Sequence, residues 1–207
     1  MDLIITIFSL IVLLFSVVIH ELAHGSVAYS LGDPTAKYAG RLTLNPIKHL
    51  DLFGSIILPL ILFLLPGGII FGWAKPVPIN PYNLRDQKWG SLKVAIAGPI
   101  SNFALALFFG LIIRLVPYSI FTANPGLLLV FTFIVQINII LAIFNLIPIP
   151  PLDGHWILFS LIGDRFVQLK VFLQQYGFFI LIILIFFGGL TGMYSIVISI
   201  FHLITGI

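Results

Sequence analysis

Two histidines one helical turn apart, with a glutamate beside the first, are the residues in this chain best suited to chemistry. His20-Glu21-Leu22-Ala23-His24 is an H-E-x-x-H motif. On a helix, residues four apart share a face, so both imidazoles can reach one zinc ion, and Glu21 becomes a candidate general base. The motif directly follows an apolar or hydroxylic run over residues 3–19. Ionisable groups at membrane depth are costly, which makes them candidates for function.

The composition places this motif in an integral membrane protein. The chain has 207 residues, of which 60% are hydrophobic and 8% charged, against about 25% charged in soluble domains. It has no cysteine, so any zinc must be held by histidine and carboxylate. The net charge of +3 comes from few residues, and it indicates topology in a lipid bilayer rather than nucleic-acid binding. No basic segment precedes the long first apolar run, so a cleaved signal peptide is not expected.

Hydropathy and helix-breaking residues predict an all-α polytopic membrane protein. The first helix should cover residues 3–31 and end at Gly32-Asp33-Pro34, which puts the motif in the half nearer the following loop. Alternation over residues 41–44 indicates a short strand. Further spans are expected at residues 91–116, 127–147 and 167–187, followed by a glycine-rich hinge and a short apolar helix. We expect a catalytic core of three transmembrane helices over residues 1–163 and C-terminal helices over residues 164–207.

A catalytic zinc site usually has three protein ligands and one open position, so the motif needs a third ligand from elsewhere. Asp153 is the best candidate among the seven acidic residues, because it closely follows a span and lies on proline-rich, irregular backbone. Such backbone is tolerated at membrane depth only where it is buried in protein or lines a cavity. The alternative is an ordinary Asp-Gly turn. With a third ligand in place, zinc would acidify a water, Glu21 would accept its proton, and the hydroxide would attack a peptide carbonyl.

Three motifs together resemble the site-2 protease family of intramembrane zinc metalloproteases. They are the H-E-x-x-H motif, Ala97-Gly98-Pro99-Ile100-Ser101-Asn102, and the run from Asn145 through Pro148, Pro150 and Pro151 to Asp153-Gly154. Residues 32–37 and 71–77 further resemble a compact subgroup. The resemblance implies one zinc per chain held by His20, His24 and Asp153, with Glu21 as catalytic base. It also implies cleavage of substrate transmembrane segments within the bilayer. Many relatives carry a PDZ or CBS domain, which the length here does not lead us to expect.

Several assignments stay open at this level. Asn102 and Asn145 either join helices by hydrogen bonds or hold the substrate backbone or its oxyanion. His155 either approaches the metal or anchors the chain at the interface beside Trp156. The alternative function is a non-catalytic membrane protein of the same fold that binds transmembrane segments or metal. A degenerate relative should lack Glu21 or a ligand, and neither is missing.

The basic residues predict that residues 52–71 enter the membrane without crossing it. Both halves of the proposed site must lie on the same side, which requires no net crossing in this segment. With such a re-entrant segment, a single basic residue, Arg114, faces the opposite side from the rest, as the positive-inside rule prefers. The N-terminus should then lie outside, with both basic loops and the active site toward the cytoplasm.

Overall fold

The computed structural model of this chain describes residues 3–51, 54, 57, 61, 74–188 and 191–207. The described residues form an all-helical fold, as predicted. Four of the described helices are long and apolar enough to cross a membrane. They are α1 (Leu3–Ser30), α4 (Gly90–Leu115), α6 (Pro125–Asn145) and α8 (Val167–Phe186). Their ends lie within two residues of the predicted ones, because Gly32-Asp33-Pro34 and the prolines after Asn145 stop the helices where the sequence indicates.

Shorter helices connect these spans. They are α2 (Thr35–Tyr38), η1 (Pro46–His49), η3 (Pro81–Asn83), α5 (Tyr118–Ala123), α7 (Gly154–Ile162), η4 (Gly163–Phe166) and α9 (Thr191–Thr205). The short apolar helix predicted at the C-terminus is α9. Helix α7 was not predicted, since the proline run suggested only a break, whereas the chain turns and becomes helical again at Gly154.

Two expectations concern the segment after α1. The predicted short strand at residues 41–44 is wrong: residues 42–44 form bends, and the described part of the chain contains no strand. Alternation alone cannot make a strand where no second strand pairs with it. The predicted re-entrant segment, residues 52–71, lies outside the described residues apart from positions 54, 57 and 61.

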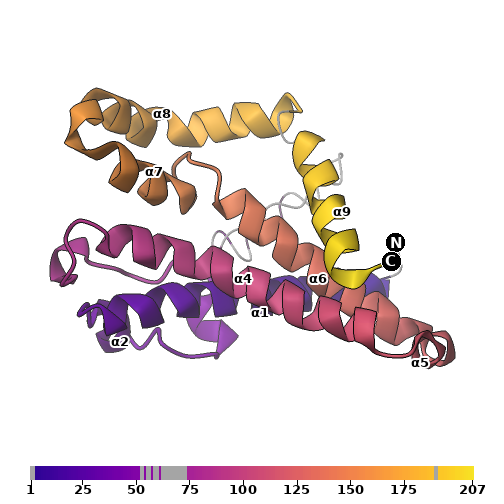
Figure 1. The fold of residues 1–207 in the computed structure, drawn as a ribbon. Helices are drawn as coiled ribbons and strands as arrows, with labels where there is room; N and C mark the ends of the chain where they lie inside the picture. Colours follow the sequence, from indigo (N-terminus) through magenta and orange to yellow (C-terminus); the bar gives the residue numbers. More distant parts are fainter. Residues whose placement is uncertain (1–2, 52–53, 55–56, 58–60, 62–73, 189–190) are drawn as a thin grey trace.

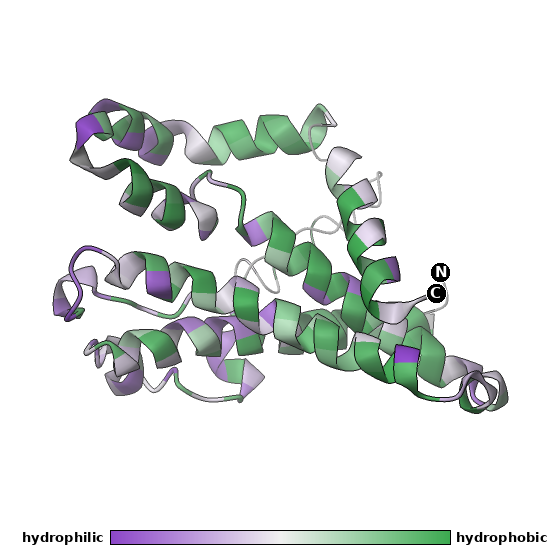
Figure 2. Ribbon diagram, in the orientation of Figure 1, coloured by the Kyte–Doolittle hydropathy of each residue, from purple (hydrophilic) through white to green (hydrophobic). Residues whose placement is uncertain are grey.

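Helix α4 occupies the centre of the packing. It contacts α1, α6, α7 and α9, and Figure 1 shows it running beside α1 with α6 crossing behind. Its apolar core toward α6 and α9 is formed by Ala106, Ile113, Val135, Ile139, Val197 and Phe201. Figure 2 shows that hydrophilic residues gather in the connecting segments at the end where α2, the start of α4 and the start of α8 lie. Helix α4 contacts both α1 and α7, and Gly98 in its first half lies against His20 and His24 of α1.

Candidate metal centre

Three side chains converge on one point between α1 and α7. His20 and His24 come from α1, and Asp153 immediately precedes α7. The two Nε2 atoms are 3.0 Å apart, and Asp153 Oδ2 lies 3.0 Å from His20 Nε2 and 3.1 Å from His24 Nε2. The imidazole planes are nearly perpendicular, at 83°. Thus the three predicted ligands meet even though 129 positions separate His24 from Asp153.

The opposite nitrogen of each histidine faces an acceptor. His24 Nδ1 is 2.7 Å from the carbonyl oxygen of Val94, and His20 Nδ1 is 2.5 Å from Asn102 Oδ1. The Asn102 amide nitrogen donates to the carbonyl of Ser16 and to Asn138 Oδ1, at 3.3 and 2.7 Å, which leaves its oxygen for His20. Both Nδ1 atoms must therefore carry the hydrogen, and in the neutral rings both Nε2 atoms are lone-pair acceptors.

This tautomer assignment leaves three acceptors facing one another at close range. Two nitrogen lone pairs and an ionised carboxylate at 3.0–3.1 Å repel each other, and a cation between them removes the repulsion. Tetrahedral zinc with bonds of about 2.0–2.1 Å separates its ligand atoms by roughly 3.3 Å, close to the spacing seen here. Two histidines and a carboxylate are also a usual donor set for catalytic zinc. The residues present fit a zinc ion.

Gly98 in α4 lets the histidines approach the helix backbone. A Cβ at this position would lie 2.4 Å from His24 Nε2 and 2.5 Å from His20 Nε2, which no real side chain tolerates. The next residue, Pro99, is buried within the helix and lacks the amide that would bond to the Ala95 carbonyl. From the sequence, Gly98 stands out only as part of a motif. Its steric role depends on a contact between two helices that the sequence does not reveal.

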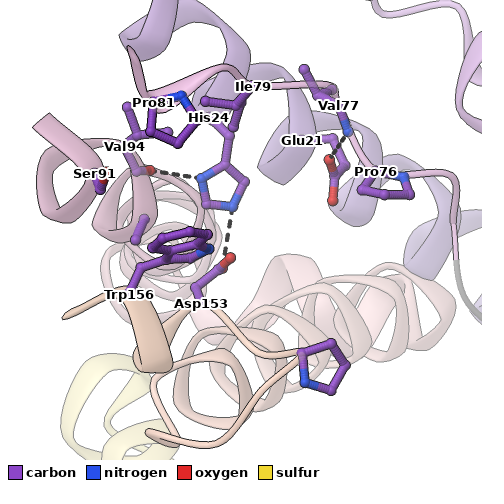
Figure 3. Close-up of a pocket in the computed structure, with 12 residues that line it drawn as sticks. Glu21, His24, Pro76, Val77, Ile79, Pro81, Ser91, Val94, Asp153 and Trp156 are labelled. Carbon is purple, nitrogen blue, oxygen red and sulfur yellow. Dashed lines mark hydrogen bonds and ion pairs between the residues drawn. The ribbon is translucent and has the colours of Figure 1, made fainter. Parts of the chain in front are cut away.

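A cavity of about 340 Å³ opens beside the cluster. Its walls include Glu21, Val77 and Trp156, as well as His24 and Asp153. Figure 3 shows His24 and Asp153 pointing toward each other, with Trp156 on one side and Glu21 and Val77 on the other. Glu21 Oε2 accepts a hydrogen bond of 2.7 Å from the Val77 amide. The carboxylate of the predicted base thus faces the same space as two of the predicted ligands.

The two candidate asparagines lie in different surroundings. Asn102 is fully buried and joins three helices, because Asn138 of α6 also donates to the Ser16 hydroxyl of α1 at 2.9 Å. Asn145 is half-buried and donates to the carbonyl of Leu141 within its own helix, at 3.0 Å. These contacts favour the helix-joining interpretation for Asn102, and they connect Asn145 to none of the three ligands.

His155 packs away from the ligand cluster. Its ring lies 4.7 Å from the ring of Trp156 and 5.2 Å from that of Phe159, measured between centroids. Its Nδ1 is 2.6 Å from the Leu152 carbonyl. The group of metal-ligating side chains found among the described residues consists of His20, His24 and Asp153 alone. His155 is buried, so its packing supports neither an approach to the metal nor a position at the membrane interface.

An apolar bundle of membrane-length helices enclosing two histidines and a carboxylate defines a membrane metalloprotein. The comparisons with known proteins then give the family: this chain belongs to peptidase family M50, whose model matches residues 8–123 and 117–187. This is the site-2 protease family that the motifs indicated, and the resemblance is confirmed.

Three relatives illustrate the match. The candidate zinc metalloprotease YwhC of Bacillus subtilis is 41% identical over 84% of this chain and 78% of its own length. The candidate zinc metalloprotease MJ0611 of Methanocaldococcus jannaschii is 35% identical over 73% of this chain and 69% of its own length. The candidate zinc metalloprotease Rip2 of Mycolicibacterium smegmatis is 30% identical over 83% of this chain and 64% of its own length. No solved structure gives a significant match.

Proposed function

We propose that this protein is a zinc metalloendopeptidase that hydrolyses peptide bonds within or near transmembrane segments of other membrane proteins. Family membership and relatives named as zinc metalloproteases support the class of enzyme and the metal. The observation that carries the proposal is the convergence of three acceptors on one point, with Glu21 in the wall of the adjoining cavity. A site enclosed by apolar helices suits substrates that reach it through the bilayer.

In this proposal His20, His24 and Asp153 would hold one zinc ion per chain. When bound, zinc polarises a carbonyl and makes water a better acid near neutral pH. Glu21 accepts the proton of the attacking water, and its carboxylate faces the cavity where the scissile peptide would lie. Asn102 keeps His20 in the tautomer that presents Nε2 to the cluster. Asn145 remains a candidate for contact with the substrate backbone.

We further propose that residues 1–163 form the catalytic core, built on α1, α4 and α6, with a re-entrant segment at residues 52–71. The C-terminal helices over residues 164–207 complete the membrane domain.

The active site would open to the cytoplasmic half. The gathering of hydrophilic connections at one end of the helices supports this orientation (Figure 2), as does the positive-inside rule. In the single variants Lys48→Cys and Lys88→Cys, neither cysteine should be labelled by a membrane-impermeant thiol reagent added to intact cells. Labelling of one and not the other would contradict the topology.

The test of catalysis compares wild type with Glu21→Gln on a transmembrane reporter peptide in liposomes. The amide cannot accept a proton, so we expect turnover to fall by about 10²–10⁴-fold, while zinc content and thermal stability stay at wild-type values. Equal cleavage by the two proteins would exclude Glu21 as the base.

The same experiment separates the enzyme from the non-catalytic alternative. A protein that only binds transmembrane segments would retain the reporter without cutting it, in both wild type and variant. The double variant His20→Ala with His24→Ala provides the metal control, since it should lose both zinc and cleavage. Full zinc retention in this variant would exclude the proposed ligand set.

A further inference from the structure

Residues 74–80 form an extended segment, here called the strap, that borders the cavity next to Glu21. The strap contains no helix or strand, and Pro76, Val77 and Ile79 contribute to the cavity wall. Its Val77 amide donates to Glu21 Oε2 at 2.7 Å. Because one carboxylate oxygen is bound to the strap, the position of the strap determines where the other oxygen points.

A buried arginine holds the beginning of the strap. Arg41 is 7% exposed, and its Nη2 donates to the carbonyl oxygens of Lys75 and Pro76 at 2.9 and 3.2 Å. The Lys75 amide in turn donates to the His49 carbonyl at 2.9 Å. Hydrogen bonds from a charged donor are stronger than neutral ones. The guanidinium therefore fixes the two carbonyls that immediately precede Val77.

A buried carboxylate holds the other end. Asp33 has no exposed surface, and its Oδ2 accepts the Asn80 amide at 2.7 Å. Its Oδ1 accepts from the Thr35 amide at 3.1 Å and from the Asn83 side chain at 2.9 Å. Burial alone would raise the pKa of Asp33, but these hydrogen bonds outweigh it and hold the pKa below its usual range. An ionised Asp33 thus ties the end of the strap to the loop after α1.

We propose that Arg41 and Asp33 are positioning residues for the general base: they hold the strap at both ends so that the Val77 amide aims Glu21 into the cavity. The inference rests on the proposed function for the role of Glu21. Neither residue needs to touch substrate. Misplacement of a catalytic group by about 1 Å can cost about 100-fold in rate, so a loosened strap should lower kcat more than it changes KM.

The kinetic test uses Arg41→Gln, with Arg85→Gln as the matched control. The Arg85 side chain is exposed, and the hydrogen bond from Arg85 to the Leu31 carbonyl is made by its backbone amide. We expect Arg41→Gln to lower kcat by about 10–100-fold, with KM within about threefold and zinc content unchanged. Arg41→Lys, which keeps the charge, should recover part of the loss. Arg85→Gln should match wild type. An Arg41→Gln protein that loses thermal stability while its folded fraction keeps wild-type kcat would overturn the proposal.

A second measurement needs no enzymatic activity. Pro76 and Pro78 have no amide hydrogen, so a peptide spanning residues 75–78 reports hydrogen exchange at Val77. Loss of one hydrogen bond, worth about 1 kcal/mol, should speed this exchange by about fivefold in Glu21→Ala and in Arg41→Gln. Wild-type exchange in both variants would overturn the proposal. If wild type fails to cleave the reporter, the proposed function fails, and the exchange result still decides whether the strap is held as proposed.

Discussion

Helices α4 and α8 are equally hydrophobic and yet have very different surroundings. Both have a mean hydropathy of 2.0 in their most apolar stretch, but 39% of that stretch is buried inside the protein in α4 and 11% in α8. Helix α4 places Gly98 and Asn102 against α1, whereas α8 exposes large side chains such as Phe178 and Phe179. One close contact of α8 with the rest of the described molecule is at Gly177, where a Cβ would lie 2.8 Å from the Pro150 carbonyl oxygen.

The difference shows what selects neighbours among membrane helices. Lipid tails are as apolar as leucine, so hydropathy gives no preference for protein over lipid. Small residues allow close backbone approach, and polar side chains seek partners that lipid cannot offer. Helix α4 has both kinds of residue where it meets α1 and α6. Changes at these positions should therefore affect the metal centre far more than changes on α8.

The largest effect should come from removing the close approach at Gly98. Gly98→Ala would place a methyl group in the space of both Nε2 atoms, so we expect zinc binding to weaken by about 100-fold or more. Gly192→Ala in α9 is the control, because a Cβ there meets no atom within 4 Å. Zinc affinity is measured by competition with a chelator. Equal affinity in the two variants would show that α1 and α4 do not approach as closely as described.

An intermediate effect is expected at Asn102. Asn102→Ala removes the acceptor that fixes the His20 tautomer, and zinc affinity should fall by about 10–100-fold. Asn145→Ala should leave zinc affinity within about twofold, because its amide bonds within its own helix. Reduced turnover with full zinc in Asn145→Ala would assign that residue to substrate. A loss of zinc in Asn145→Ala equal to that in Asn102→Ala would contradict the comparison.

The smallest effect should appear on α8. Gly177→Ala would press on the Pro150 carbonyl, three residues before Asp153. Overpacking costs roughly 1 kcal/mol or more. Because only part of this free energy is spent on displacing the Asp153 carboxylate, we expect about a threefold loss of zinc affinity. Phe179→Ala, at a side chain that is 62% exposed, should change nothing measurable. If Phe179→Ala proves the more harmful of the two, α8 makes contacts beyond those described.

The predicted helices are confirmed because hydropathy is a local pattern, and the three residues predicted as ligands lie together in the structure. Hydropathy locates spans, and H-E-x-x-H locates two ligands on one helical face. The contacts between helices were harder to foresee. Asn138 was not predicted as a partner, although a polar residue inside an apolar span is a signal in itself. Ser16, its hydrogen-bond partner, was not predicted either, although it lies one turn before His20 on the same face of α1. The bond from Val77 to Glu21 spans 56 positions, and no periodic pattern encodes such a contact.

The separation of the ligands along the chain also has a consequence for biosynthesis. His24 leaves the ribosome 129 residues before Asp153, and at about 5–20 residues per second that interval lasts roughly 6 to 26 s. During this time the first two ligands are already in the nascent polypeptide without the third. A translation product truncated before Asp153 should enter the bilayer but retain zinc poorly, so the nascent chain completes its metal site only after α6 has been synthesised.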